Sequence, residues 1–286
     1  MMKTLSYKFF NSKNNTKYYS TMYKEINFKE SYPANVKRLE IFLSLIKKYK
    51  PKKIIDAGCG TGMPLIKIKK MRFNISGYDK AKNIVKEAKI NLKNNNLDEN
   101  LIQSGDFENP KHIKDNSVNC ILGMGTFYYS KKFIQTLKNQ KRKLMKNGHL
   151  IFSLRNQLFD IATLNDYSIK FYSKLYEINK FKPIIKKKYL KLFSGYSNRK
   201  KFKLKNLDDN QVFSNIHNPL TIENDILNKI GLKLNGIYFY HYHAIPPIFE
   251  NIDKINFRKQ SFKIEKPNDW RGFFIASGFV VDSQKA

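Results

Sequence analysis

The feature that most constrains the fold of this sequence is an apolar segment, Ile54 to Ala57, that runs directly into a glycine-rich loop. The loop reads Gly-Cys-Gly-Thr-Gly over residues 58–62, and a helical pattern follows it. Glycines allow the backbone to turn sharply and to approach a ligand closely, and open α/β sheets bind ligands at the carboxyl ends of their strands. The segment therefore predicts a buried strand followed by a ligand-binding loop.

Two other nucleotide-binding loops do not fit this segment. The dinucleotide fingerprint GxGxxG would place its third glycine at position 63, which is Met63. A phosphate-binding P-loop needs Gly-Lys-Ser/Thr after four spacer residues, and this combination is absent. Both alternatives are therefore set aside.

The pattern around the loop predicts an α/β fold. One amphipathic helix, from Val36 to Ile46, precedes the breaker Pro51. From Lys53 onward, short apolar runs alternate with longer helical segments, which is typical of βαβ units and a parallel sheet. Strands are expected at 53–57, 73–78, 100–104, 118–123 and 148–154, and later at 233–243 and 272–281, with a helix over 221–230 that ends at Gly231.

The segment from about Lys53 to Asn156 resembles the core of the class I S-adenosylmethionine (SAM) dependent methyltransferases in the order and spacing of its motifs. The first motif of that family is an acidic residue followed by GxGxG, which is Asp56 and the three glycines here. Asp79 ends the second expected strand, where a carboxylate is suited to accept both ribose hydroxyl hydrogens. Gly105-Asp106-Phe107 ends the third strand and resembles the adenine contact of the family.

This resemblance implies a Rossmann-like, seven-stranded, mostly parallel sheet with an antiparallel last strand, and SAM as the cofactor. The chain departs from the family pattern twice. Asn119 stands where the fourth strand usually opens with an acidic residue, and Lys146 to His149 replaces the usual Pro-Gly-Gly turn. The expected cofactor-binding residues are Asp56, Gly58, Cys59, Gly60, Gly62, Asp79, Lys80, Asp106, Phe107 and Met124.

The residues that bind the methyl acceptor are expected at the carboxyl ends of strands four to six, in the cap, and at the entry to the last strand. Strand four runs into Tyr128 and Tyr129, which either face the acceptor or pack on the core. Strand five ends in Arg155 and Asn156, where a guanidinium suits a carboxylate or phosphate on the substrate. Asn156 is alternatively a solvated helix cap.

The sixth expected strand carries His241 and His243, which lie two residues apart and therefore on one face. A histidine near neutral pKa can deprotonate an acceptor, so either is a candidate base, with a hydrogen-bonding role in the pocket as the alternative. A metal site that adds His217 is not favoured, because no acidic partner lies at ligand spacing. Trp270 and Arg271, before the last strand, are expected to border the same cleft or to cover the core edge.

These patterns divide the chain into four parts. Residues 1–50 form an amino-terminal lid and helix, 51–156 the SAM-binding core, 157–222 a helical cap inserted after strand five, and 223–286 the strands that complete the sheet. In related proteins such amino-terminal segments fold over the cofactor, and the lid residues expected here are Tyr18-Tyr19 and Tyr32-Pro33-Ala34-Asn35.

The function predicted from the sequence is methyl transfer from SAM to a small or medium polar acceptor: a metabolite, a sugar or a lipid-linked intermediate. One alternative is an RNA methyltransferase that uses the basic stretch from Lys180 to Lys205, which contains no acidic residue. Its weakness is the absence of an Asn/Asp-Pro-Pro-Tyr-like motif at a strand end. A second alternative is a regulatory protein that binds SAM without catalysis.

The net charge of +31 is the main argument for a nucleic-acid partner, since basic surfaces release counterions from phosphate backbones. Most of the positive charge comes from lysine, and lysine, asparagine and isoleucine are enriched together. An AT-rich coding sequence enriches these three residues on any protein surface, whatever its function. A small-molecule substrate is therefore favoured over a nucleic acid. The oligomeric state is left open.

The cysteines and the apolar runs indicate the cellular setting. Cys59 and Cys120 are too few for a disulfide framework and too far apart for a metal knuckle. Met1 to Asn15 holds no apolar run of signal-peptide length, and no run reaches the roughly 18 residues of a membrane span. A cytoplasmic protein without a transmembrane segment is expected.

Overall fold

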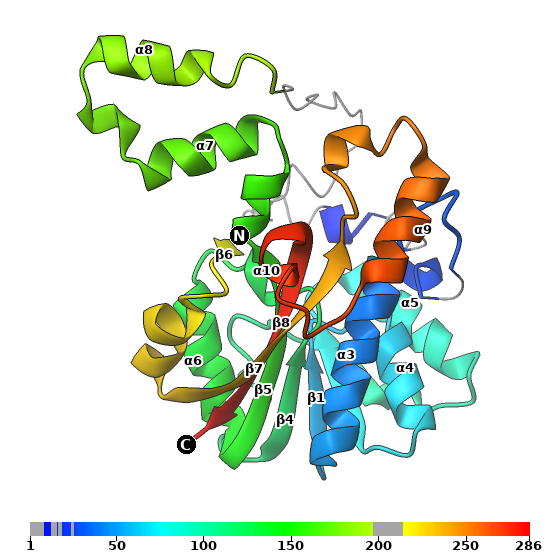
Figure 1. Cartoon of the computed structure of the whole chain (residues 1–286). Helices are drawn as coiled ribbons and strands as arrows, with labels where there is room; N and C mark the ends of the chain where they lie inside the picture. The colour runs from blue at the N-terminus through cyan, green and yellow to red at the C-terminus, as the bar shows by residue number, and fades with distance from the viewer. Residues whose placement is uncertain (1–8, 13–15, 17–18, 24–25, 197–213) are drawn as a thin grey trace.

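The fold is built on one sheet, in which seven strands follow the order β3-β2-β1-β4-β5-β8-β7 (Figure 1). The computed structural model describes residues 9–12, 16, 19–23, 26–196 and 214–286. The strands are β1 (Ile54–Ala57), β2 (Ile75–Asp79), β3 (Ile102–Ser104), β4 (Val118–Gly123), β5 (Leu144–Asn156), β6 (Ile216–His217), β7 (Leu232–Tyr242) and β8 (Ala276–Lys285).

The directions of the strands confirm the predicted fold class. Strands β1 to β5 pair in parallel, whereas β8 lies antiparallel between β5 and β7. The sheet also holds an eighth strand that the sequence did not predict. This strand, β6, pairs with Arg155 and Asn156 of β5, beyond the point where the pairing of β4 with β5 ends at Phe152.

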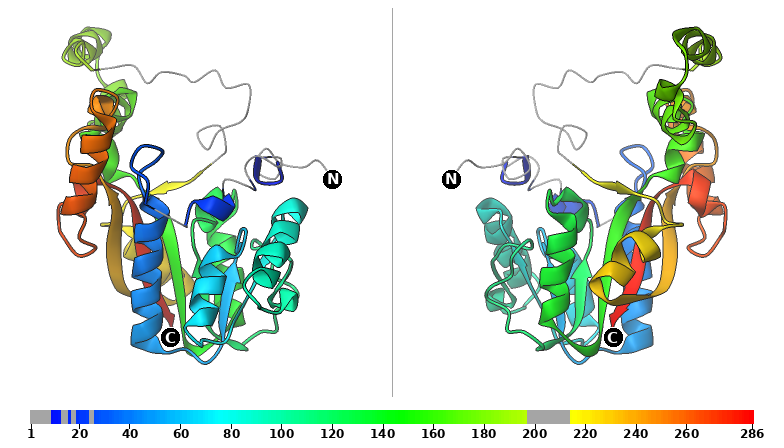
Figure 2. Two further views of the ribbon diagram at one scale, coloured as in Figure 1. Left: turned by 90° about the vertical axis from the view of Figure 1, so that its right-hand side faces the viewer. Right: turned by 90° about the vertical axis from the view of Figure 1, so that its left-hand side faces the viewer.

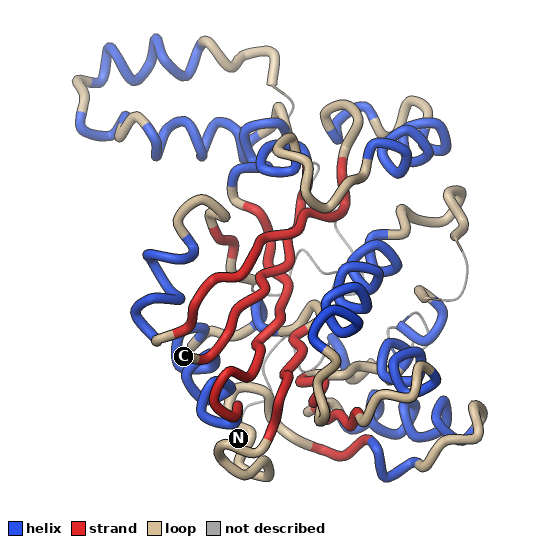
Figure 3. Tube along the Cα trace, turned by 60° about the horizontal axis from the view of Figure 1, so that its bottom comes forward, coloured by secondary structure: helices blue, strands red, loops and turns tan. Residues whose placement is uncertain are grey.

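Helices cover both faces of the sheet (Figure 3). On one face α3 (Ala34–Tyr49), α4 (Met63–Lys70) and α5 (Lys82–Lys93) share a buried cluster with Ile54 of β1. On the other face α6 (Phe133–Lys143) shares a second cluster with Ile55, because successive strand residues point to opposite faces.

The carboxyl-terminal region differs from the sequence prediction in one place. The apolar run that begins at Gly272 was expected to be strand throughout, but its first four residues form the helical turn α10 (Gly272–Ile275) and β8 begins at Ala276. The turn starts at Asp269, whose carboxylate accepts from the Arg271 N–H and whose carbonyl accepts from the Gly272 N–H. The predicted helix over 221–230 is a π-helical and a 3-10 segment, η5 (Glu223–Leu227) and η6 (Asn228–Ile230), and ends at Gly231 as predicted.

Two segments stand beyond the carboxyl ends of the parallel strands. The first follows β5 through η3 (Leu158–Ala162) and comprises α7 (Asp166–Leu175), η4 (Ile178–Lys180) and α8 (Pro183–Lys191). The second follows β7 and comprises η7 (Pro247–Phe249) and α9 (Lys254–Ile264). Figure 2 shows both segments at the same end of the molecule, and in Figure 1 the first lies to the left and the second to the right. Within the described residues, no helix combines the length and the apolarity needed to cross a bilayer.

Candidate active site

A cavity of about 460 Å³ lies at the carboxyl ends of β1, β2 and β4. Its position is the one predicted from the glycine loop, and its size is that of a small-molecule site. Nine of the ten predicted cofactor residues and two of the predicted acceptor residues line it. These eleven residues are Asp56, Gly58, Cys59, Gly60, Asp79, Lys80, Asp106, Phe107, Met124, Tyr128 and Tyr129.

The glycine loop is held by hydrogen bonds to β2 and to the loop after β4. The N–H groups of Gly58 and Cys59 donate to the Tyr78 carbonyl at 2.8 and 3.0 Å, and the Thr126 hydroxyl donates to the Gly58 carbonyl at 3.1 Å. Gly58 has a φ of +74°, and a Cβ there would lie 2.3 Å from Thr126 Cγ2. Gly60 also has a positive φ, but a Cβ there would meet no atom of the described residues within 4 Å, and Gly60 lines the cavity.

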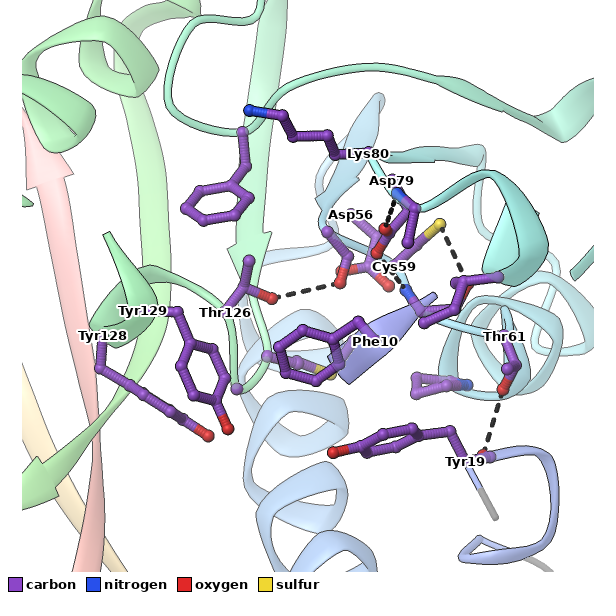
Figure 4. A pocket seen from close by; sticks show the side chains of 18 of the residues that line it. Phe10, Tyr19, Asp56, Cys59, Thr61, Asp79, Lys80, Thr126, Tyr128 and Tyr129 are labelled. Atoms are coloured by element: carbon purple, nitrogen blue, oxygen red, sulfur yellow. Dashed lines mark hydrogen bonds between the residues drawn. The ribbon is translucent and has the colours of Figure 1, made fainter. Parts of the chain in front are cut away.

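Asp79 connects the glycine loop to the start of α5. Its Oδ2 accepts from the Gly60 N–H at 3.1 Å and its Oδ1 accepts from the Ala81 N–H at 2.9 Å (Figure 4). Burial raises the pKa of this carboxyl group, and the backbone donors oppose that shift. Each carboxylate oxygen keeps further acceptor capacity, which is available to hydroxyl groups in the cavity.

Asp56 is the most unusual group in the wall of the cavity. Its side chain is only 1% exposed, and its Oδ1 has no hydrogen-bond partner among the described residues. Its pKa is raised to about 7, chiefly by burial and to a lesser extent by the charge of Asp79, while the Arg38 guanidinium opposes the shift. Since a buried polar atom without a partner is costly, this oxygen fits a cationic donor supplied by a ligand.

Arg38, which the sequence analysis did not single out, brings a buried positive charge to the same cavity. Its guanidinium donates to Asn35 Oδ1 at 2.8 Å and to the Tyr23 hydroxyl at 3.2 Å. The sequence does carry a signal for it. Arg38 lies three and four residues before Ile41 and Phe42, so it occupies the buried stripe of α3.

The opposite end of the cavity is polar and aromatic. Lys80 Nζ pairs with Asp106 Oδ2 at 2.6 Å, and Asp106 Oδ1 accepts from the Glu108 N–H at 2.9 Å. The Phe107 carbonyl accepts from Gln140 Nε2 at 2.6 Å, which fixes the backbone beside the Phe107 ring. This arrangement places one aromatic face and one carboxylate at the mouth of the cavity.

Residues from the amino-terminal segment lie over the cavity. Phe10 contacts Tyr129 with their ring centroids 5.1 Å apart, and the Tyr19 carbonyl accepts from the Thr61 hydroxyl at 3.1 Å (Figure 4). Met22 and Tyr23 also line it. Of the expected lid residues, Tyr19 and Asn35 line the cavity, Tyr32 donates from its hydroxyl to Glu265, and Tyr18 lies outside the described residues.

Three predicted site residues, from the glycine loop and from the end of β5, do not line the cavity. Gly62 precedes the first turn of α4. Arg155 lies with its guanidinium carbon 5.3 Å from the centre of the Tyr128 ring. The Asn156 amide is buried and donates to the carbonyls of Gly272, Phe273 and Ala276, and its Oδ1 accepts from the Leu158 N–H. Asn156 therefore joins β5 to α10, and both its amide nitrogen and its amide oxygen are hydrogen-bonded.

His241 of β7 and His243, which directly follows the strand, form a cluster of side chains that do not line the cavity. The rings of His241 and His243 are 4.7 Å apart, and His241 also stacks on Tyr32. His241 Nδ1 lies 2.7 Å from the Ser277 hydroxyl, whereas His243 Nδ1 has no partner among the described residues. Burial lowers the pKa of His243 to about 4 and that of His241 well below its usual value. Both rings are therefore neutral at pH 7.

The remaining predicted residues are also placed away from the cavity. Trp270 is 69% exposed, and Arg271 pairs with Asp269 at 2.6 Å. His217 packs on the Phe133 ring with 4.4 Å between the centroids. In the part of the chain that the structure describes, no three His, Cys, Asp or Glu side chains are grouped as metal ligands.

Comparison with known proteins identifies the class. The family model described as methyltransferase domain matches residues 48–207, more than half of the chain, so the chain belongs to that family. The protein is a class I methyltransferase that uses SAM as its methyl donor. No curated protein matches the sequence.

Two solved structures show the same fold. A SAM-dependent methyltransferase from Thermotoga maritima, described as a possible histamine N-methyltransferase, is 15% identical with a TM-score of 0.53, covering 98% of this chain and 99% of its own. Magnesium protoporphyrin IX methyltransferase from Synechocystis PCC 6803 with bound SAH is 12% identical with a TM-score of 0.57, covering 100% of both chains. At these low sequence identities, the similarity to the two structures establishes the fold alone.

Proposed function

We propose that this methyltransferase acts on a small or medium polar acceptor, a metabolite, sugar or lipid-linked intermediate, held beside Tyr128 and Tyr129. The observation that carries this proposal is the extent of the cavity. It runs from the glycine loop to these two tyrosines and is covered by Phe10 and Tyr19. A covered cavity of this size suits a small ligand better than an extended polymer.

The side chains in the wall fit SAM along its length. The Asp79 carboxylate suits the ribose hydroxyls, and Asp106 with Phe107 suits the adenine ring and its amino group. Asp56 and Arg38 carry opposite charges in the wall. They match the ammonium and carboxylate of the amino-acid end of the cofactor, and the unpartnered Oδ1 of Asp56 supports this assignment.

The bound cofactor supplies a methyl group on a positively charged sulfur, and no covalent intermediate with the protein is needed. The protein then contributes by orienting the two reactants and by excluding water. Phe10 and Tyr19, which lie over the cavity, would exclude water, and Arg38 and Asp56 would hold the amino-acid end of the cofactor. Tyr128 and Tyr129 present hydroxyl groups that orient a polar acceptor.

We assign Arg155 to acceptor binding, because its guanidinium lies over the Tyr128 ring at the edge of the cavity. His241 and His243 receive a structural role. They are neutral at pH 7, and they are packed among Tyr32, Phe159 and Phe257. This proposal leaves catalysis to proximity and orientation.

The proposal is tested by measuring conversion of SAM to S-adenosylhomocysteine with separate acceptor pools. The pools are a small-molecule extract, a lipid extract and total RNA, each offered to the wild-type protein and to Asp79→Ala as the matched control. Turnover with the small-molecule or lipid extract that Asp79→Ala abolishes supports the proposal. Turnover with RNA alone would refute it.

A further inference from the structure

The segment from Asp166 to Tyr196, which we call the arm, exposes an unusual amount of apolar surface. The chain has nineteen exposed large apolar side chains among its described residues, and seven of them lie in the arm. Every residue from 181 to 188 is exposed, and α8 contains no buried residue. The seven side chains are Leu175, Tyr176, Phe181, Ile184, Ile185, Leu190 and Leu192.

The arm is an ordered hairpin, with its own aromatic contacts between α7 and α8. Tyr172 stacks on Phe193 with 6.0 Å between centroids, and Tyr189 contacts both Phe193, at 5.1 Å, and Tyr176, at 6.4 Å. These contacts hold the two helices together. They leave the aliphatic side chains of α8 exposed, and Leu192, which directly follows α8, is 77% exposed.

The arm is also strongly basic. Residues 166–196 contain eight lysines against two acidic residues. Lys186, Lys187 and Lys188 are exposed and directly follow the exposed pair Ile184 and Ile185. A short helix that combines exposed aliphatic side chains with lysines is suited to the interface of an anionic bilayer, where the apolar groups enter the headgroup region and the lysines pair with phosphates.

A second exposed apolar segment lies at the same end of the molecule. The loop after β7 exposes Ile245, Phe249, Ile252 and Ile255, and Ile252 is 81% exposed. Figures 1 and 2 place this loop and the arm at the same end of the molecule, beyond the carboxyl ends of the parallel strands, with the arm on the left and the loop on the right in Figure 1. This is also the end of the sheet at which the cofactor cavity lies.

We propose that the arm and the loop at residues 245–255 dock this methyltransferase on an anionic lipid surface. The composition of the surface favours this occupant over two others. A second copy of the chain would bring the same lysines and a net charge of +31 against them, which opposes association. RNA would use the lysines and could stack on Tyr176 and Phe181, but the other five exposed apolar side chains of the arm are aliphatic and give single strands nothing to stack on.

Docking at this end would hold the cavity close to the headgroups. The docking proposal goes beyond the proposed function, because lipid binding can be measured without any methyl transfer. Failure of either proposal therefore leaves the other standing.

The experiment is vesicle sedimentation with the full-length protein. Vesicles of phosphatidylcholine alone are compared with vesicles of phosphatidylcholine and phosphatidylglycerol in equal parts. Binding is expected to the anionic vesicles and to weaken as salt rises. The triple variant K186Q/K187Q/K188Q is expected to lower the partition coefficient by about 10²-fold, since each lysine near such a surface contributes roughly a factor of five.

Two further variants separate docking from the general positive charge. I184S/I185S/L192S keeps every lysine and is expected to lose at least about tenfold in partition. K47Q/K52Q/K67Q removes three exposed lysines at the amino-terminal end of the sheet, and it is expected to bind as well as wild type within about threefold. All of these side chains are exposed, so unchanged thermal unfolding serves as the folding control.

Three results would overturn the proposal. The first is an absence of binding to anionic vesicles at low salt. The second is an equal loss in the K47Q/K52Q/K67Q control, which would reduce the effect to net charge. The third combines two observations: I184S/I185S/L192S binds vesicles as well as wild type, and the wild-type protein binds RNA whereas K186Q/K187Q/K188Q does not. Together they would make the arm a nucleic-acid surface. I252S tests the loop, and a partition unchanged from wild type would remove the loop from the docking surface.

Discussion

The pH dependence of cofactor binding is the sharpest test of the site, because one buried carboxyl group controls it. The pKa of Asp56 is raised to about 7, chiefly by burial. The ammonium group of the cofactor pairs only with the ionised carboxylate, so binding requires Asp56 to be without its proton. The apparent affinity for SAM is therefore expected to rise with pH through neutrality.

The magnitude follows from the pKa. At pH 6 roughly one molecule in eleven carries ionised Asp56, and at pH 7.5 roughly three in four do. The apparent Kd is expected to fall about eightfold between these two values, which isothermal titration calorimetry measures directly. Asp56→Asn should bind SAM more weakly at pH 7.5 and with a flat profile. Asp106→Asn, which removes another carboxyl group from the same cavity, should keep the slope.

Stability provides a second readout of the same group. The pKa of Asp56 in the folded protein lies above the unfolded value of about 4. Proton binding by Asp56 therefore stabilises the folded state at low pH, and this stabilisation is lost as the pH rises through about 7. A pKa about three units above the unfolded value corresponds to about 4 kcal/mol of free energy that opposes ionisation of Asp56 in the folded protein. This is an upper bound on the gain in the free energy of unfolding expected for Asp56→Asn. The variant should raise the Tm of the cofactor-free protein at pH 8. A wild-type affinity that is constant from pH 6 to 7.5, or a slope that survives in Asp56→Asn, would refute the reasoning.

Four other substitutions test the placement of individual residues. Gly58→Ala should lower SAM affinity in calorimetry at least about tenfold, because the new Cβ collides with Thr126 and a positive φ costs about 1–2 kcal/mol. Asn156→Ala should lower the free energy of unfolding by about 2–4 kcal/mol in denaturant titrations, with unchanged SAM affinity, since three carbonyls lose their donor. Arg155→Ala should raise the acceptor KM about tenfold or more without weakening SAM binding. His243→Ala should change kcat by less than about tenfold, whereas loss of a general base would cost about 10²-fold or more.

The sequence predicts the central part of the fold because its signals there are local. The strand at 118–123 is predicted with its observed bounds, and the glycine loop follows directly from three alternate glycines. Strand β6 could not be predicted, since a two-residue strand has no pattern of its own. It forms because β5 extends beyond β4 and leaves backbone groups to be paired.

The acceptor side was harder to predict because it depends on tertiary packing. Two histidines two residues apart were expected on one face, and their rings do lie side by side. However, His241 adopts a φ of +62°, which interrupts the regular alternation of the strand, and the pair packs against Tyr32 and Phe257. Arg38 was missed although its place in the apolar stripe of α3 marks it as buried. The sequence does not show that this part of the stripe borders a cavity, and that neighbourhood is what makes Arg38 a site residue.

The end of β5 shows how strand geometry separates two residues that look equivalent in the sequence. Ser153 accepts from the N–H of Gly125, which lines the cavity, so the odd-numbered residues at this end of the strand point to the side on which Gly125 lies. Arg155 follows the same alternation and reaches Tyr128, whereas Asn156 points to the other face and holds α10. Only one of two adjacent polar residues can therefore contact the acceptor. For that reason Arg155→Ala should act on acceptor binding and Asn156→Ala on stability.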